Sequence, residues 1–152
     1  MIPTTTRVEQ HTDETVNEQI RSETERNISY VGRQGRDEIS RRLGELDHEW
    51  DMERTLEANA ASIALLGLGL GAFVNRRFFV LPAVVAGFLL QHAVQGWCPP
   101  VPVFRRLGFR TAREIASERY ALKALRGDFG DLPETHTTDE EKARRILAAM
   151  NR

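Results

Sequence analysis

The chain has 152 residues, of which 41% are apolar and 28% charged, and its formal net charge is −1. That balance hides a change of sign, because residues 1–60 carry a net charge of −6, residues 61–126 carry +7 and residues 127–152 carry −2. The apolar residues concentrate in residues 58–97, where Arg76 and Arg77 are the only formal charges, which disfavours a soluble domain with an evenly distributed core.

The N-terminal part of the chain is polar. Residues 1–14 are rich in threonine and have no apolar period, so we expect a disordered tail. Residues 15–57 are expected to form amphipathic helices that lead into a membrane. The first of these helices should begin at the capping-box spacing of Thr15 and Glu18, and its end is marked by Gly32 and Gly35.

A second amphipathic helix is expected to begin at Arg36, followed by two acidic residues in its first turn. Its apolar residues follow at helical spacing: Ile39, Leu43, Leu46 and Trp50. We find no stop signal before the apolar region. The sequence therefore predicts that this helix continues directly into the first membrane span.

Residues 58–97 are predicted to form a transmembrane helical hairpin. Ala58–Val74 provides 17 residues and Phe78–Trp97 provides 20, close to what is needed to cross a hydrocarbon core of about 30 Å. Asn75–Arg77 leaves room only for a tight turn between the two spans. We therefore expect an all-α fold, with a two-span hairpin and amphipathic cytoplasmic helices on both sides.

A soluble antiparallel helix pair is the alternative interpretation of these two segments. It is disfavoured because the first segment is apolar around its whole circumference from Ile63 to Val74, whereas a surface helix needs a polar face. Glycines weaken a soluble helix by about 1 kcal/mol each but are common where membrane helices approach closely. The small residues predicted to form helix-packing faces are Ala60, Ala64, Gly67, Gly71, Ala83 and Gly87. Packing within the hairpin is favoured over packing between two copies of the chain.

Polar residues lie near the end of the second span. Gln91, His92 and Gln95 are a candidate polar face at membrane depth, and Gln91 and Gln95 share one side of the helix. Bonding across a helix interface is the favoured interpretation. A small channel, carrier or auxiliary transport subunit that uses this face is the alternative.

The end of the hairpin is expected at the membrane interface and turn formed by Trp97, Cys98, Pro99 and Pro100. Cys98 is the only cysteine, which excludes an internal disulfide and a multi-cysteine metal site. No base or cation is placed to activate its thiol, and the remaining histidines have no metal-ligand spacing. We therefore predict no catalytic residues, no cofactor and no metal.

Residues 98–127 are predicted to be a basic juxtamembrane segment followed by a helix that begins after the Thr111 cap and ends at Gly127. Residues 128–152 should form a linker and a short amphipathic helix. Four arginines are candidates for contact with lipid headgroups rather than with nucleic acid: Arg105, Arg106, Arg110 and Arg113. Basic residues outnumber Arg76 and Arg77 on the other side, which places both termini in the cytoplasm.

The central region resembles a family of bacterial inner-membrane hairpins of unknown function, a domain that also forms the membrane part of YgaP-like rhodaneses. The resemblance covers residues 50–110 and rests on Met52–Arg54, the glycines of residues 67–71, the short turn, and the motif at residues 96–100 followed by 105–108. It implies a multi-pass protein of the bacterial inner membrane. The chain has no rhodanese domain, so sulfur-transfer activity is not implied.

Together, these features predict a membrane-anchored interaction or scaffold protein without enzymatic activity. Its expected partners are the lipid bilayer and either a second copy of the chain or an unidentified membrane protein.

Overall fold

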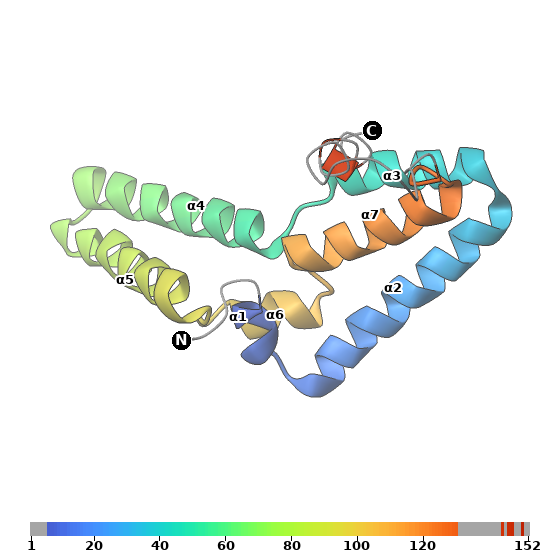
Figure 1. Ribbon diagram of the computed structural model, residues 1–152. Coiled ribbons are helices and arrows are strands. Elements are labelled where there is room, and N and C mark those ends of the chain that lie inside the picture. Colours follow the sequence, from blue (N-terminus) through green and yellow to red (C-terminus); the bar gives the residue numbers. More distant parts are fainter. Residues whose placement is uncertain (1–5, 131–143, 145, 148–149, 151–152) are drawn as a thin grey trace. The chain divides into compact units, whose positions relative to one another are not determined.

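The computed structural model describes residues 6–130, 144, 146–147 and 150. Its regular structure over this part of the chain is entirely helical, which confirms the expected all-α class (Figure 1). The elements are α1 Arg7–Gln10, α2 Glu14–Gln34, α3 Arg36–His48, α4 Met52–Phe73, the 3-10 helix η1 Arg76–Phe79, α5 Val80–Gln95, α6 Val101–Arg106 and α7 Ala112–Arg126.

The chain divides into two compact units, each made from two stretches of sequence. The hairpin unit consists of Met1–Arg21 and Trp50–Arg113. The arm unit consists of Ser22–Glu49 and Glu114–Arg152.

The expected disorder of residues 1–14 is wrong where the structure describes this segment. Arg7–Gln10 forms α1, and Val8 is only 2% exposed. Val8 packs in a core with Met52 and Leu56, which are distant in sequence. The burial of Val8 therefore could not be predicted from the residues next to it. Residues 1–5 lie outside the described part.

The α2 helix begins one residue before the predicted cap. The side chain of Asp13, not that of Thr15, caps it by accepting a hydrogen bond from the Thr15 backbone amide at 2.9 Å. The Asp13 carbonyl also accepts the amides of Val16 and Asn17. At the other end, Gly35 has a φ of 100° and separates α2 from α3.

The predicted continuity between the second amphipathic helix and the first span is also wrong. The α3 helix ends at His48, and α4 begins only at Met52. Asp51 is extended, and its Oδ1 accepts the backbone amide of Arg54 at 2.7 Å, so this residue starts a new helix as an N-cap. The break between α3 and α4 is therefore marked by the Asp51 cap, although the helical spacing of apolar residues continues across it.

The arm unit has its own small apolar core. It is formed by α2, α3 and α7, with Ile28 packed against its buried members, which are Val31, Ile39, Leu43, Leu46, Ile115 and Leu122. Ile39, Leu43 and Leu46 of the expected apolar stripe thus lie in this core, whereas Trp50 follows the end of α3 and is 46% exposed.

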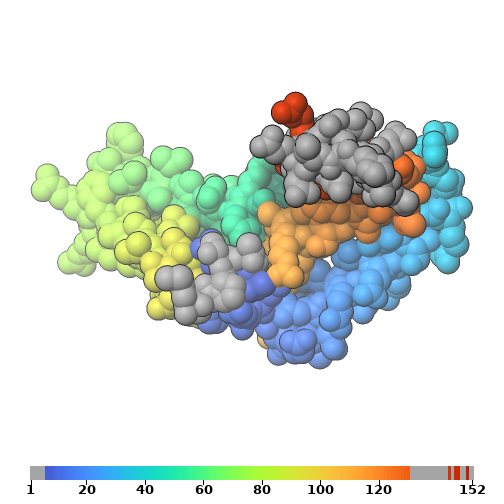
Figure 2. Space-filling model, in the orientation of Figure 1, coloured from blue at the N-terminus to red at the C-terminus, as the bar shows by residue number. Residues whose placement is uncertain are grey.

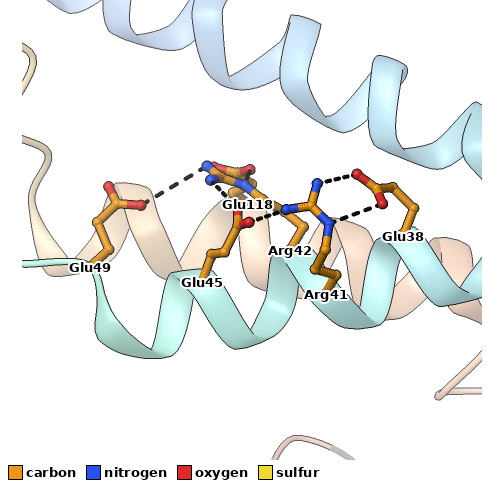
Figure 3. Close-up of polar contacts among 6 residues, drawn as sticks. All are labelled: Glu38, Arg41, Arg42, Glu45, Glu49 and Glu118. Carbon is orange, nitrogen blue, oxygen red and sulfur yellow. Dashed lines mark hydrogen bonds and ion pairs between the residues drawn. The ribbon is translucent and has the colours of Figure 1, made fainter.

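A buried ion pair joins α3 to α7 beside that core. The side chain of Glu118 is fully buried, and its carboxylate accepts hydrogen bonds from Nε and Nη2 of Arg42 at 2.9 and 3.3 Å. Figure 3 shows Arg42 also facing Glu45 and Glu49, at 3.2 and 4.0 Å. The hydrogen bonds to Glu118 raise the pKa of Arg42, so this cation is fixed in its charged form.

The short helix α6 is absent from the prediction, which treated residues 98–110 as an irregular basic segment. Pro100 occupies its N-cap and Pro102 its first turn, where a missing backbone amide does least harm. The predicted start of α7 after Thr111 and its end before Gly127, which has a φ of 90°, are confirmed. Most of the predicted C-terminal linker and helix, 131–152, lies outside the described residues.

Candidate membrane-spanning hairpin

Two stretches of the described chain contain helix that is long and apolar enough to cross a membrane, Arg36–Phe73 and Arg76–Gln95. The apolar part of the first stretch is in α4, which has 22 residues, while η1 and α5 have 4 and 16. At rises of about 1.5 Å per α-helical and 2.0 Å per 3-10 residue, each side is a little over 30 Å long. The apolar lengths are shorter, because Glu53, Arg54 and Glu57 lie in the first turns of α4 and Arg76 and Arg77 begin η1. Residues 58–73 and 78–95 are about 24 and 28 Å long, at the lower limit for a hydrocarbon core of about 30 Å.

The α4 and α5 helices lie side by side and antiparallel within the hairpin unit (Figures 1 and 2). Large apolar side chains project outward along both of them, with Phe73 91% exposed and Val94 71% exposed. The others with more than 60% exposure are Leu65, Leu66, Val74, Val80 and Leu90. Apolar surface of this extent is unfavourable in water, at about 25 cal/mol per Å².

The second segment of the hairpin packs against α4 at two glycines, Gly67 and Gly71. A Cβ atom added at Gly67 would lie 2.7 Å from Cδ of Pro82, and one added at Gly71 would lie 2.7 Å from Cδ1 of Phe79. Both glycines are buried, so the structure uses them for packing within the hairpin. Ala60 and Ala64, on the same side of α4, are partly buried.

The predicted small-residue face of the second span is not at this contact. Ala83 is exposed, and a Cβ atom added at Gly87 would meet nothing within 4 Å. Packing within the hairpin does not use these two residues, because Phe79, Leu81 and Pro82, at the start of the second segment, pack on the glycines of α4. Packing of Ala83 and Gly87 between two copies stays a prediction.

The turn of the hairpin is tight and closed by hydrogen bonds. The carbonyl of Leu70 accepts the backbone amides of both Val74 and Asn75 at 2.9 Å, and Oδ1 of Asn75 accepts the amide of Arg77 at 2.9 Å. Arg76 and Arg77 are exposed. The turn therefore presents two cations at the end of the apolar surface.

The opposite end of α5 differs from the prediction. The helix ends at Gln95 with Gly96 in a left-handed conformation, φ 79°, rather than at the prolines. Trp97 is partly buried and Pro99 is exposed. Cys98 is 4% exposed in a core with Val8, Met52, Leu56 and Val101. Burial raises the pKa of the Cys98 thiol and disfavours its thiolate.

The N-terminal segment closes this end of the hairpin. Nη1 of Arg7 donates a hydrogen bond to the carbonyl of Ala93 at 2.9 Å, one of the last carbonyls of α5. A Cβ atom at Gly96 would lie 2.6 Å from Cβ of Arg7. The contact between Arg7 and the end of α5 was not predicted from the sequence, in which Gly96 is the local feature that permits it.

The three polar residues near the end of α5 differ in burial. His92 is 6% exposed, Gln91 is partly buried and Gln95 is exposed. Among the described residues, neither ring nitrogen of His92 has a hydrogen-bond partner. A continuous polar path along α5 is therefore not formed by these three side chains.

Two of the four arginines expected at lipid headgroups are buried instead. Arg105 is 1% exposed and donates hydrogen bonds to Oδ1 of Asn17 at 2.9 Å and to the Phe109 carbonyl at 3.1 Å. Arg110 is 8% exposed, and its carbonyl accepts the Met52 amide at 2.8 Å. The expectation is wrong for both. Arg105 is held by acceptors on Asn17 and Phe109 and lies on the same side of α6 as Val101, and Arg110 is buried where its backbone pairs with the start of α4.

The other two arginines remain at the surface. Arg106 is exposed, and Arg113 is exposed with an ion pair to Glu9 at 3.4 Å. The expected surface position of these two residues agrees with the structure, and Arg113 already has a partner in Glu9.

Comparison of the chain with models of known protein families, with curated proteins and with solved structures finds no match. Within the described residues, no group of three or more His, Cys, Asp or Glu side chains is placed to hold a metal ion.

Proposed function

We propose that the chain is an integral membrane protein that anchors a charged helical unit to the bilayer as an interaction or scaffold protein. The observation that carries the proposal is the exposed apolar surface of α4 and α5. The two apolar cores, which lie outside residues 58–97, bury their members almost completely. A lipid environment removes the cost of the exposed surface.

The proposed topology places both termini in the cytoplasm. Orientation depends on the number of Lys and Arg residues near the span ends as the chain inserts, so the later burial of Arg105 and Arg110 does not weaken the argument. We also propose that the membrane is the bacterial inner membrane, because the central region resembles bacterial inner-membrane hairpins.

The interaction role is supported by the surface of the arm unit. Tyr30 is 61% exposed and Leu125 is 58% exposed, and the same unit has a helix face on α3 that is rich in paired charges. On that face, Arg41 pairs with both Glu38 and Glu45 (Figure 3), and its hydrogen bonds lower the pKa of Glu38. Aromatic and aliphatic side chains within a polar rim are typical of surfaces that bind another protein.

Alkaline carbonate extraction of membranes tests the proposal. The wild-type protein should stay in the membrane pellet. Replacing Leu66 and Leu90 by arginine should release it, because each arginine near the middle of a span costs about 2.5 to 3.5 kcal/mol. Leu107→Arg, an equally exposed leucine outside the hairpin, is the matched control and should remain in the pellet. Release of the wild-type protein would rule out an integral anchor.

A further inference from the structure

A cavity of about 400 Å³ lies within the arm unit, between α3 and α7. Three cations of α7 line it, Arg119, Lys123 and Arg126, spaced so that they lie on one side of the helix. The α3 helix contributes Ser40, Gly44 and Asp47. Asp47 pairs with Arg119 and Asp128 pairs with Arg126, so among the described residues Lys123 carries the excess positive charge of this group.

Lys123 is the central cation of this group, and its side chain is buried. The residue is 5% exposed, and its ammonium donates a hydrogen bond to the carbonyl of Met150 at 2.6 Å. Among the described residues, no carboxylate pairs with it. A buried ammonium is costly unless an anion or several acceptors compensate it, so an anion bound in the cavity beside Lys123 would lower that cost.

The two arginines on either side of Lys123 are held in place by neighbouring groups. Arg119 is fixed by Asp47 at 2.7 Å and by the Leu46 carbonyl at 3.1 Å. Arg126 is fixed by both carboxylate oxygens of Asp128, at 2.8 and 2.5 Å. Its Nη1 also donates to Oγ of Ser40 at 3.0 Å. Side chains that are already positioned lose less conformational entropy when they bind an anion.

The cavity is open because α3 carries a glycine on this side. A Cβ atom added at Gly44 would meet nothing within 4 Å. The volume exceeds what a bare phosphate ion fills and lies in the range of small-ligand sites, which is about 300 to 1,000 Å³.

We propose that this cavity binds the phosphate group of a phosphate-bearing ligand, with Lys123 as the central cation and the guanidinium groups of Arg119 and Arg126 beside it. Clustered Lys and Arg side chains are the usual partners of phosphate, because they combine charge with several hydrogen-bond donors. The phosphate belongs either to a soluble small molecule or to the headgroup of an anionic lipid. This proposal does not depend on α4 and α5 crossing a membrane.

Calorimetric titration of the full-length protein in neutral detergent with inorganic phosphate tests the site. We expect saturable binding that Lys123→Gln weakens at least tenfold. Arg33→Gln, which removes an exposed cation at the end of α2, should leave binding unchanged. Short-chain phosphatidylglycerol then separates the two sources. Its competition with phosphate identifies a lipid headgroup, and the absence of competition identifies a soluble ligand.

A second variant keeps the test valid if Lys123→Gln disturbs folding. Gly44→Leu leaves all three cations in place and fills the cavity, and it replaces a glycine by a better helix former. It should retain helical circular dichroism and lose phosphate binding. The proposal fails if the wild-type protein shows no saturable binding or if Gly44→Leu binds as well as wild type. It also fails if binding appears only when Asp139, Glu140 and Glu141 are neutralised, since the chain would then supply its own anion.

Discussion

Single glycines determine how closely the two helices of the hairpin approach. Replacing Gly67 and Gly71 by leucine would force side chains into Pro82 and Phe79, whose nearest atoms lie only 2.7 Å from the place that a Cβ atom would occupy. We expect a loss of about 1 to 3 kcal/mol of hairpin stability, as in overpacked cores. Resistance of the purified protein to proteolysis in detergent measures this loss.

Gly69 provides the matched control for that prediction. It lies between the two packed glycines in the same helix, yet a Cβ atom there would meet nothing within 4 Å. Gly69→Leu should therefore leave protease resistance unchanged. Equal damage from Gly69→Leu and from the double replacement would contradict the proposed packing.

Cys98 should react slowly with maleimide in the folded protein. Its burial limits access to the sulfur, and the raised pKa of its thiol lowers the fraction of reactive thiolate at neutral pH. Labelling followed by mass spectrometry should show a large increase in rate after denaturation. Rapid labelling of the native protein would show that the core around Val8, Met52 and Val101 is not formed.

Among the helices, α6 is secured to the hairpin unit by a buried arginine. Arg105→Met should destabilise the unit by about 1 to 3 kcal/mol, because Oδ1 of Asn17 and the Phe109 carbonyl, both part-buried, lose a charged donor. Arg106→Met removes the exposed neighbour and should have little effect. Thermal unfolding followed by circular dichroism compares the two. Similar melting temperatures for both variants would contradict the buried role of Arg105.

The sequence was sufficient for the helices whose signals are local. The apolar runs, the turn at Asn75–Arg77 and the ends of α7 all follow from composition, capping residues and glycine. The break before α4 was missed because the cap at Asp51 lies within a continuing apolar period. Elements that depend on distant partners, such as α1 through Val8, were also missed.

The same distinction applies to the candidate site. Gly67 and Gly71 could be identified as packing residues from their spacing, because the second segment had to return along the first. The inward position of Arg105 could not be predicted, since it depends on Asn17, which is 88 residues away in the chain. A basic cluster beside a span therefore indicates lipid contact only for the members that the fold leaves exposed.

At the scale of the whole molecule, the account depends on α4 and α5 crossing a bilayer with both flanks on the same side. Cysteine accessibility tests this most directly, in a Cys98→Ala background with single cysteines at Arg36, Asn75 or Arg113. In intact cells, an impermeant maleimide should label the cysteine at position 75 and should label those at 36 and 113 only after permeabilisation. Shielding of position 75 in intact cells together with the other two would contradict a hairpin that spans the membrane.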